Sequence, residues 1–114
     1  MPPRAPEFLT DKVLTSIKAH IFENLSGKIS IDDLANIAGM KPSQFRSTFK
    51  AQLHKTPYQF VLDTRVNRAR DMLATTQLCC SKVAFDCGFS SQSHMTDVFR
   101  QRLGKTPRQI QLER

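Results

Sequence analysis

The chain contains one stretch of sequence twice, and this internal repeat constrains its fold more than any other feature. Residues 45–60 match residues 95–110 at an offset of fifty, and residues 34–40 match residues 83–89 at an offset of forty-nine. Two copies are too few for a solenoid, which needs about three or more stacked units to bury a continuous core. We therefore interpret each copy as a helix-turn-helix. The matched positions of the longer stretch are Phe45, Phe49, Lys50, Leu53, Lys55, Thr56 and Pro57 in the first copy, and Met95, Phe99, Arg100, Leu103, Lys105, Thr106 and Pro107 in the second.

Apolar residues recur at helical spacing along most of the chain, and no segment alternates long enough with the period of two that a strand requires. We predict an all-α protein of about seven helices. Local signals mark their ends: Thr10 as an N-cap, Gly27 as a C-cap, and Gly39 as a turn residue with positive φ. The capping boxes at 56–59 and 106–109 each open a further helix. The predicted helices cover about 11–24, 31–38, 42–53, 57–74, 80–87, 92–103 and a short segment from 107.

The length of 114 residues fits one domain, or two very small lobes that share a linker. Residues 1–9, which include three prolines, are predicted to be a flexible stub or linker. The folded domain is predicted to span 10–112. Its first helix-turn-helix subdomain covers about 10–56 and its second about 75–112. The helix at 57–74 is predicted to connect them, with a length of roughly 25 Å at 1.5 Å per residue.

The net charge of +7 and the pI near 9.8 indicate a polyanionic partner. The charge is concentrated, because residues 41–70 carry seven Lys or Arg and only one acidic residue. This basic segment begins at the second helix of the first copy and continues into the connector. A solvated helix face is the simpler interpretation of any charge run. The basic segment coincides with the repeat, however, and this favours a surface that binds nucleic acid.

The second helix of each copy has a polar outward surface. In a helix-turn-helix the outward side chains of this helix reach base edges, and Gly39 and Gly88 would supply the two tight turns. Hydroxyl, amide and guanidinium groups pair with base edges and phosphates. The same groups suit an ordinary solvent-facing surface, and for any single residue that interpretation is the better one. The set as a whole favours DNA, and it comprises Ser43, Gln44, Arg46, Ser47 and Lys50 in the first copy and Gln92, Ser93, His94, Thr96, Asp97 and Arg100 in the second.

A set of residues in both copies and in the connector forms a longer pattern. They are Leu34-Ala35, Ala38-Gly39-Met40, Phe49-Lys50, Arg65, Ala69, Leu73, Val83-Ala84, Gly88-Phe89, Ser93-His94, Phe99-Arg100 and Gly104-x-Thr106-Pro107. In these residues the sequence resembles the AraC/XylS family, the arabinose-regulator type of bacterial transcription factor. The resemblance covers about residues 10–112, and a paired pattern of this length is far more specific than a single helix-turn-helix.

The resemblance implies a transcriptional regulator that inserts two recognition helices into successive major-groove segments of double-stranded DNA. The helices would lie about one helical turn (~34 Å) apart and read a bipartite site of roughly 20 base pairs. Base contacts are predicted for Ser43, Gln44, Arg46, Ser47, Gln92, Ser93, His94 and Thr96. Phosphate contacts are predicted for Lys41, Lys50, Arg65 and Arg100. The resemblance also implies RNA polymerase as a partner.

Three residues depart from the family pattern. Lys41 stands where the family often has a capping Ser, which weakens the cap and adds charge near DNA. His54 occupies the position that matches Gly104, so this helix end is predicted to be strained or differently shaped. Asp97 stands where the family commonly has Arg. A carboxylate repels phosphates and accepts hydrogen bonds from cytosine N4, which predicts weaker or altered binding by the second copy.

Other chemistries find little support in the sequence. Cys79, Cys80 and Cys87 lack the paired spacing of zinc ligands, and the last two fall on the buried stripe of a short helix. No Gly-rich phosphate loop, carboxylate pair or H-E-x-x-H motif is present, so we predict neither enzymatic activity nor a cofactor. No apolar run approaches the ~20 residues of a membrane span. We predict a cytoplasmic protein that is nucleoid-associated when bound.

Two questions stay open at the level of sequence. The alternative function is a helical protein-interaction module whose basic face docks an acidic partner. The chain could also be a whole regulator, or the C-terminal part of a longer one with an effector-binding or dimerisation domain outside this sequence. The proline-bearing N-terminus favours the longer protein.

Overall fold

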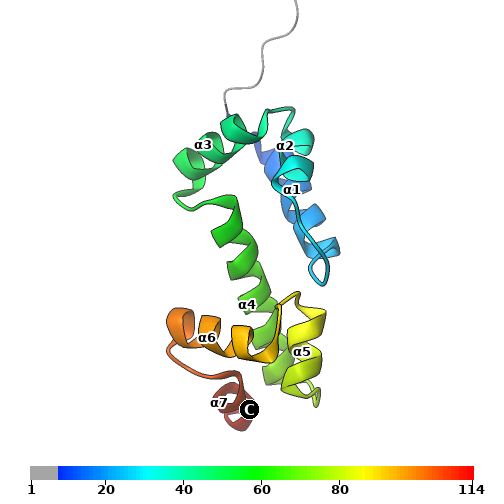
Figure 1. Cartoon of the computed structure of the whole chain (residues 1–114), viewed down its shortest axis with the longest axis vertical. Coiled ribbons are helices and arrows are strands. Elements are labelled where there is room, and N and C mark those ends of the chain that lie inside the picture. Colours follow the sequence, from blue (N-terminus) through cyan, green and yellow to red (C-terminus); the bar gives the residue numbers. More distant parts are fainter. Residues whose placement is uncertain (1–7) are drawn as a thin grey trace, which may run out of the picture. The chain divides into compact units, whose positions relative to one another are not determined.

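The computed structural model describes residues 8–114, and every regular element within this range is an α-helix. The predicted all-α class with seven helices is therefore confirmed (Figure 1). Residues 1–7, which make up most of the predicted stub, lie outside the described residues. The helices are α1 (Asp11–Glu23), α2 (Ile31–Ala38), α3 (Pro42–Leu53), α4 (Pro57–Thr75), α5 (Cys80–Asp86), α6 (Gln92–Leu103) and α7 (Pro107–Leu112).

The described chain forms two compact units. The first comprises the chain up to Asn24 together with residues 28–61, and the second comprises 25–27 together with 62–114. Each unit contains one copy of the repeat, with α2 and α3 in the first and α5 and α6 in the second. The division falls within α4, so this helix begins in one unit and continues in the other.

The core of the first unit is formed by the apolar faces of its helices. Phe45 and Phe49 of α3 are almost completely buried, and their rings lie 5.5 Å apart between centroids. Phe60 contacts Phe49 edge-on at 5.6 Å. Ile17 and Ile21 of α1 are fully buried in the same unit. The predicted apolar stripe of α3 is therefore confirmed at both Phe positions, and its last member, at position 53, is partly buried.

Leu9 belongs to the first unit and not to a flexible stub. Its side chain is 3% exposed. Its backbone N–H donates to Oε1 of Gln52, and Nε2 of Gln52 donates back to the Leu9 carbonyl oxygen at 3.0 Å. This paired contact spans 43 residues of sequence. The amide of Gln52 thus anchors the chain one residue before the boundary that the sequence predicted.

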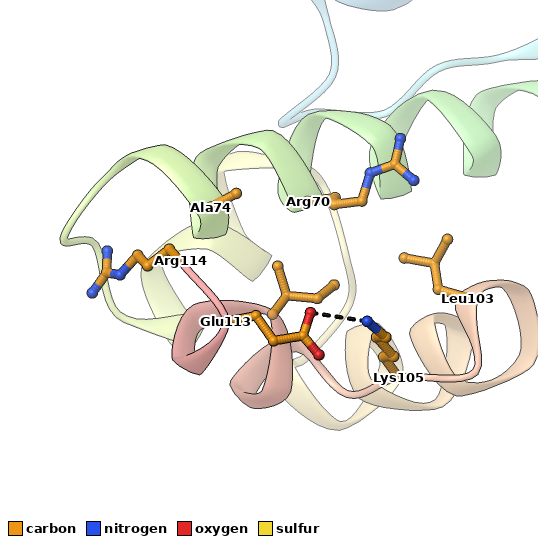
Figure 2. Close-up of a pocket in the computed structure, with 7 residues that line it drawn as sticks. Arg70, Ala74, Leu103, Lys105, Glu113 and Arg114 are labelled. Atoms are coloured by element: carbon orange, nitrogen blue, oxygen red, sulfur yellow. Dashed lines mark hydrogen bonds and ion pairs between the residues drawn. The ribbon is translucent and has the colours of Figure 1, made fainter.

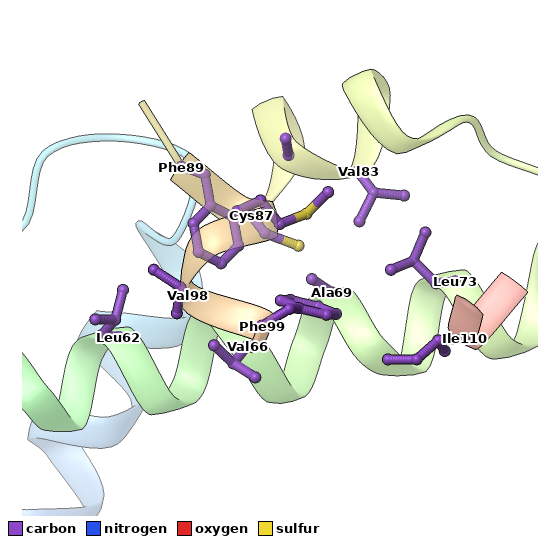
Figure 3. Packing of buried hydrophobic residues seen from close by; sticks show 12 residues of the cluster. Leu62, Val66, Ala69, Leu73, Val83, Cys87, Phe89, Val98, Phe99 and Ile110 are labelled. Atoms are coloured by element: carbon purple, nitrogen blue, oxygen red, sulfur yellow. The ribbon is translucent and has the colours of Figure 1, made fainter. Parts of the chain in front are cut away.

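The core of the second unit gathers around α4 (Figure 3). Ala69 and Leu73 of α4 are fully buried, as are Val83, Cys87 and Phe99 from the helix-turn-helix. Further members of the cluster are Leu62 and Val66 along the same helix and Ile110 from α7. Fully burying a side chain of the size of valine, leucine or phenylalanine contributes about 1.5 to 3 kcal/mol. The predicted connector is therefore also a core element of the second unit.

The predicted capping signals are largely confirmed. At α4 and α7 the threonine hydroxyl accepts from the backbone of the residue three positions on, and the glutamine at that position accepts in return from the threonine N–H. Thr10 caps α1 and Ser30 caps α2 in the same way with one hydroxyl. One capping prediction was wrong: α1 ends at Glu23 as expected, but its C-cap is Asn24 and not Gly27. The backbone N–H and the side-chain amide of Asn24 both donate to the His20 carbonyl.

The ends of α3 and α6 have the same backbone conformation but different residues. His54 has φ +62° and its counterpart Gly104 has φ +68°. Among the described residues, His54 is the only non-glycine residue with positive φ. A side chain at left-handed φ costs about 1–2 kcal/mol, and glycine avoids this cost. The predicted strain at His54 is therefore present.

We expect His54→Gly to raise the free energy of unfolding by about 0.5 to 1 kcal/mol, because relief of strain exceeds the added freedom of the unfolded chain. Gly104→Ala is the matched reverse change. A Cβ there would meet no atom within 4 Å, so only backbone strain opposes it, and we expect a loss of about 1 kcal/mol. Urea denaturation followed by circular dichroism measures both. A destabilised His54→Gly protein would contradict strain at this helix end.

Candidate nucleic-acid interface

Helix α3 presents a polar, basic surface on the side opposite its buried phenylalanines. Ser43, Arg46, Ser47 and Lys50 are exposed, and Gln44 is partly buried. The two phenylalanines at positions i and i+4 fix which side of the helix turns inward. The four exposed residues therefore form one continuous outward strip. It carries two cations and no carboxylate.

The N-terminus of α3 has no side-chain cap. Lys41 occupies the N-cap position in extended conformation, and its side chain makes no capping hydrogen bond. The predicted weak cap is thus confirmed. The first backbone N–H groups of α3 consequently lack a capping side-chain acceptor at this position, and the positive end of the helix dipole is joined by an exposed ammonium group. Such an end attracts anions.

Helix α6 presents a second polar surface, which differs in its cap and its charge. Ser91 caps the helix, because its hydroxyl accepts from the His94 N–H at 2.9 Å. Gln92, Ser93, Asp97 and Arg100 are exposed. Together with Thr96 they line a shallow hollow along the outward side of the helix. This strip holds one cation and one carboxylate.

Two of the residues on α6 that were predicted to contact bases are less accessible to a ligand than the sequence indicated. His94 is partly buried, with its ring against Phe89 at 5.6 Å between centroids. Its Nδ1 accepts from the Ser90 N–H at 3.3 Å, so in the neutral ring Nε2 carries the proton and is the remaining polar atom. The Thr96 hydroxyl donates to the Gln92 carbonyl at 3.0 Å. Each of these side chains retains capacity for a further hydrogen bond.

Arg65 on α4 has a structural role that the sequence did not indicate. Its guanidinium donates to the backbone carbonyl of Gly27 at 2.9 Å, and its Nε lies 3.4 Å from the Leu25 carbonyl oxygen. The turn at Gly88 lies against the same atoms, since a Cβ there would clash with the Leu25 oxygen and the guanidinium. The phosphate contact of Arg65 stays a prediction.

Ion pairs engage three of the five acidic residues of the second unit. Lys82 pairs with Asp86 at 3.0 Å, and Arg102 pairs with Asp63. A third pair, at 2.9 Å, joins Lys105 and Glu113 across a hollow whose walls include Leu103, Ile110 and Ala74 (Figure 2). On α6, by contrast, neither Asp97 nor Arg100 has an ion-pair partner within the described chain. Asp97 and Arg100 are therefore both available to bind a ligand.

The three cysteines occupy different environments. Cys87 is fully buried, and burial raises the pKa of its thiol to about 11. Cys80 is partly buried, and desolvation also raises its pKa. Cys79 is exposed, and a hydrogen bond with the Ser81 side chain lowers its pKa. Between residues 8 and 114, no group of three His, Cys, Asp or Glu side chains could hold a metal ion. Within the same range, no helix is both long and apolar enough to span a bilayer.

Comparison with known proteins identifies the family. Residues 34–112 match the helix-turn-helix domain family, which is more than half of the chain. The chain is 30% identical to an AraC-type DNA-binding domain protein from Chromobacterium violaceum of known structure, with a TM-score of 0.82 over 90% of this chain and 91% of that one. The chain belongs to the AraC-type helix-turn-helix family of DNA-binding domains.

Two further relatives indicate how such domains are used. The DNA-binding domain of AdpA, solved in complex with a target DNA, has a TM-score of 0.80 and 28% identity, over 88% of this chain and 90% of that one. The probable transcriptional regulator LumQ of Photobacterium leiognathi is 40% identical over 95 residues. That match covers 83% of this chain but only 38% of LumQ. The chain thus spans about a third of the length of the curated relatives that it matches.

We expect Arg65→Ala to lower the free energy of unfolding by about 1 kcal/mol, because two backbone carbonyls lose a charged donor. Arg100→Ala removes the same charge from an exposed site without such bonds and should change stability by no more than about 0.5 kcal/mol. Urea denaturation of both variants measures the difference. Equal stability of the two variants would contradict the structural role of Arg65.

Proposed function

We propose that the chain is the DNA-reading part of a bacterial transcriptional regulator, and that α3 and α6 enter successive major-groove segments of one bipartite site. The observation that carries this proposal is the repeated helix-turn-helix, in which each second helix buries its apolar side and turns a polar strip outward. The proposed site is roughly 20 base pairs long, because half-sites lie about one helical turn apart. Such a site has no palindromic symmetry, since the two strips differ in sequence.

Base readout is assigned to the outward strips. Arg46 is the strongest candidate, because its exposed guanidinium can pair bidentately with O6 and N7 of guanine. The amides of Gln44 and Gln92 match the donor and acceptor of adenine, and Nε2 of His94 can donate to guanine. The shorter hydroxyl residues pair with several bases, and they are Ser43, Ser47, Ser93 and Thr96.

Phosphate contacts are assigned to cations beside the strips. Lys50 and Arg100 occupy matched positions, one turn beyond the base-reading residues of their helices. Lys41 adds a charge at the uncapped N-terminus of α3. Arg65 on α4 is the fourth residue to which a phosphate contact is assigned. These contacts position the protein on DNA and carry no sequence information of their own.

The names and lengths of the relatives support a proposed setting for the protein. The relatives are named as transcriptional regulators, so we infer a regulatory and not a catalytic role in the bacterial cytoplasm, on nucleoid DNA. The greater length of these relatives supports a further effector-binding or dimerisation domain in the intact regulator. RNA polymerase is the proposed partner at the promoter, and no cofactor is proposed for this domain.

The test is selection from a randomised duplex library at about 150 mM salt, followed by sequencing of the bound fraction. We expect two short motifs about 10 base pairs apart. Arg46→Ala should relax one position of one motif, at a cost of about 1–3 kcal/mol for its preferred sequence. Salt-sensitive binding without any enriched motif would overturn sequence reading and favour a basic face that docks an acidic protein.

Lys41→Ser should change stability and DNA affinity in opposite directions. Serine restores the missing N-cap and should raise the free energy of unfolding by about 0.5–1 kcal/mol. Loss of the ammonium should weaken binding to all sequences alike and reduce the slope of log K against log salt by about 1. Lys28→Ser, in an exposed loop, removes the same charge without adding a cap. Denaturation and titrations at several salt concentrations measure both effects, and unchanged affinity of Lys41→Ser would contradict the phosphate role.

A further inference from the structure

The two outward strips differ in charge at matched positions. At the constant offset of fifty, Arg46 of α3 corresponds to Thr96 of α6, and Ser47 corresponds to Asp97. The cation one turn further on is retained, as Lys50 and Arg100. At the first of these positions α6 has a hydroxyl where α3 has a guanidinium, and at the second it has a carboxylate where α3 has a hydroxyl. We call α3 and α6 the first and second reading helices. The two helices cannot prefer the same bases.

Asp97 is free to act as an acceptor. Its side chain is exposed and makes no hydrogen bond or ion pair within residues 8–114. Three of the other four acidic residues of the second unit are engaged, since Asp63, Asp86 and Glu113 each pair with a basic side chain. Asp97 also lines the hollow on the outward side of α6, one turn before Arg100. The carboxylate thus lies on the surface that would face the groove.

A carboxylate in the major groove requires a donor, because the flanking phosphates repel it and an unpaired charge away from water is unfavourable. Guanine presents only acceptors on its major-groove edge, and thymine presents an acceptor and a methyl group. Adenine offers its N6 amino group beside N7, whose lone pair opposes a second carboxylate oxygen. Cytosine offers its N4 amino group and has no acceptor of its own on that edge. The chemistry therefore selects cytosine.

We propose that Asp97 makes the second reading helix selective for a cytosine, whose N4 amino group donates to the carboxylate. This inference rests on the proposed function, since it names a base that the second half of the site must contain. Arg100 lowers the repulsion between the carboxylate and the backbone by contacting a phosphate. Asp97 is thus a specificity-determining residue and not a defect of the second helix.

The test compares library selections for the wild-type chain, Asp97→Asn and Ser47→Asn. Asparagine pairs bidentately with adenine, so Asp97→Asn should replace one cytosine of the second motif by adenine and leave the first motif unchanged. The wild type should prefer a duplex with that cytosine over its adenine counterpart by at least about fivefold, and the variant should reverse the order. Ser47→Asn is the matched change in α3 and should alter only the first motif. Circular dichroism confirms that each variant is folded.

The outcomes separate the inference from the proposed function. Two wild-type motifs with no cytosine that responds to Asp97→Asn would overturn the inference and leave the bipartite reader in place. The inference would equally be overturned if Asp97→Asn tightened binding to all sequences alike, because the carboxylate would then act only through its charge. A wild-type protein that selects no motif at all would overturn the proposed function itself.

Discussion

Burial of one apolar stripe on each second helix determines what the rest of the molecule can do. In α3 the stripe is formed by Phe45 and Phe49, and in α6 by Met95 and Phe99. A helix whose inward side is fixed in this way has no freedom to rotate about its axis, because rotation would expose these large side chains to water. The polar strip on the opposite side is therefore held facing outward. Recognition by this domain depends on packing before it depends on any polar contact.

The helices and their ends were predictable because their signals are local. The capping boxes, the turn at Gly39 and the strain at His54 each depend on residues a few positions apart. Contacts across long stretches of sequence were not predictable in the same way. The Leu9–Gln52 pair joins residues 43 positions apart, and the bond from Arg65 to the carbonyl at position 27 spans 38. A glutamine or arginine on a helix surface gives no sign that its partner is a distant backbone group.

The candidate site shows the same limit. The outward positions followed from the repeat and the helical period, and the structure places most of them at the surface. The sequence did not predict which of these side chains are already engaged by other groups of the protein. His94 is held by the Ser90 N–H and the Phe89 ring, and this depends on how the turn folds back on the helix. Nor did any local pattern indicate that carbonyl groups engage Arg65, because those groups lie in a loop far away in the sequence.

Each copy of the repeat has its own hydrophobic core, and this has a consequence for how the domain can change over generations. A substitution on one reading helix does not disturb the packing of the other, because the buried residues behind the two helices belong to separate units. In the proposed two-part reader, base preference can therefore change in one half at a time while the other half still binds DNA. The difference between Ser47 and Asp97 at matched positions is a change of this kind.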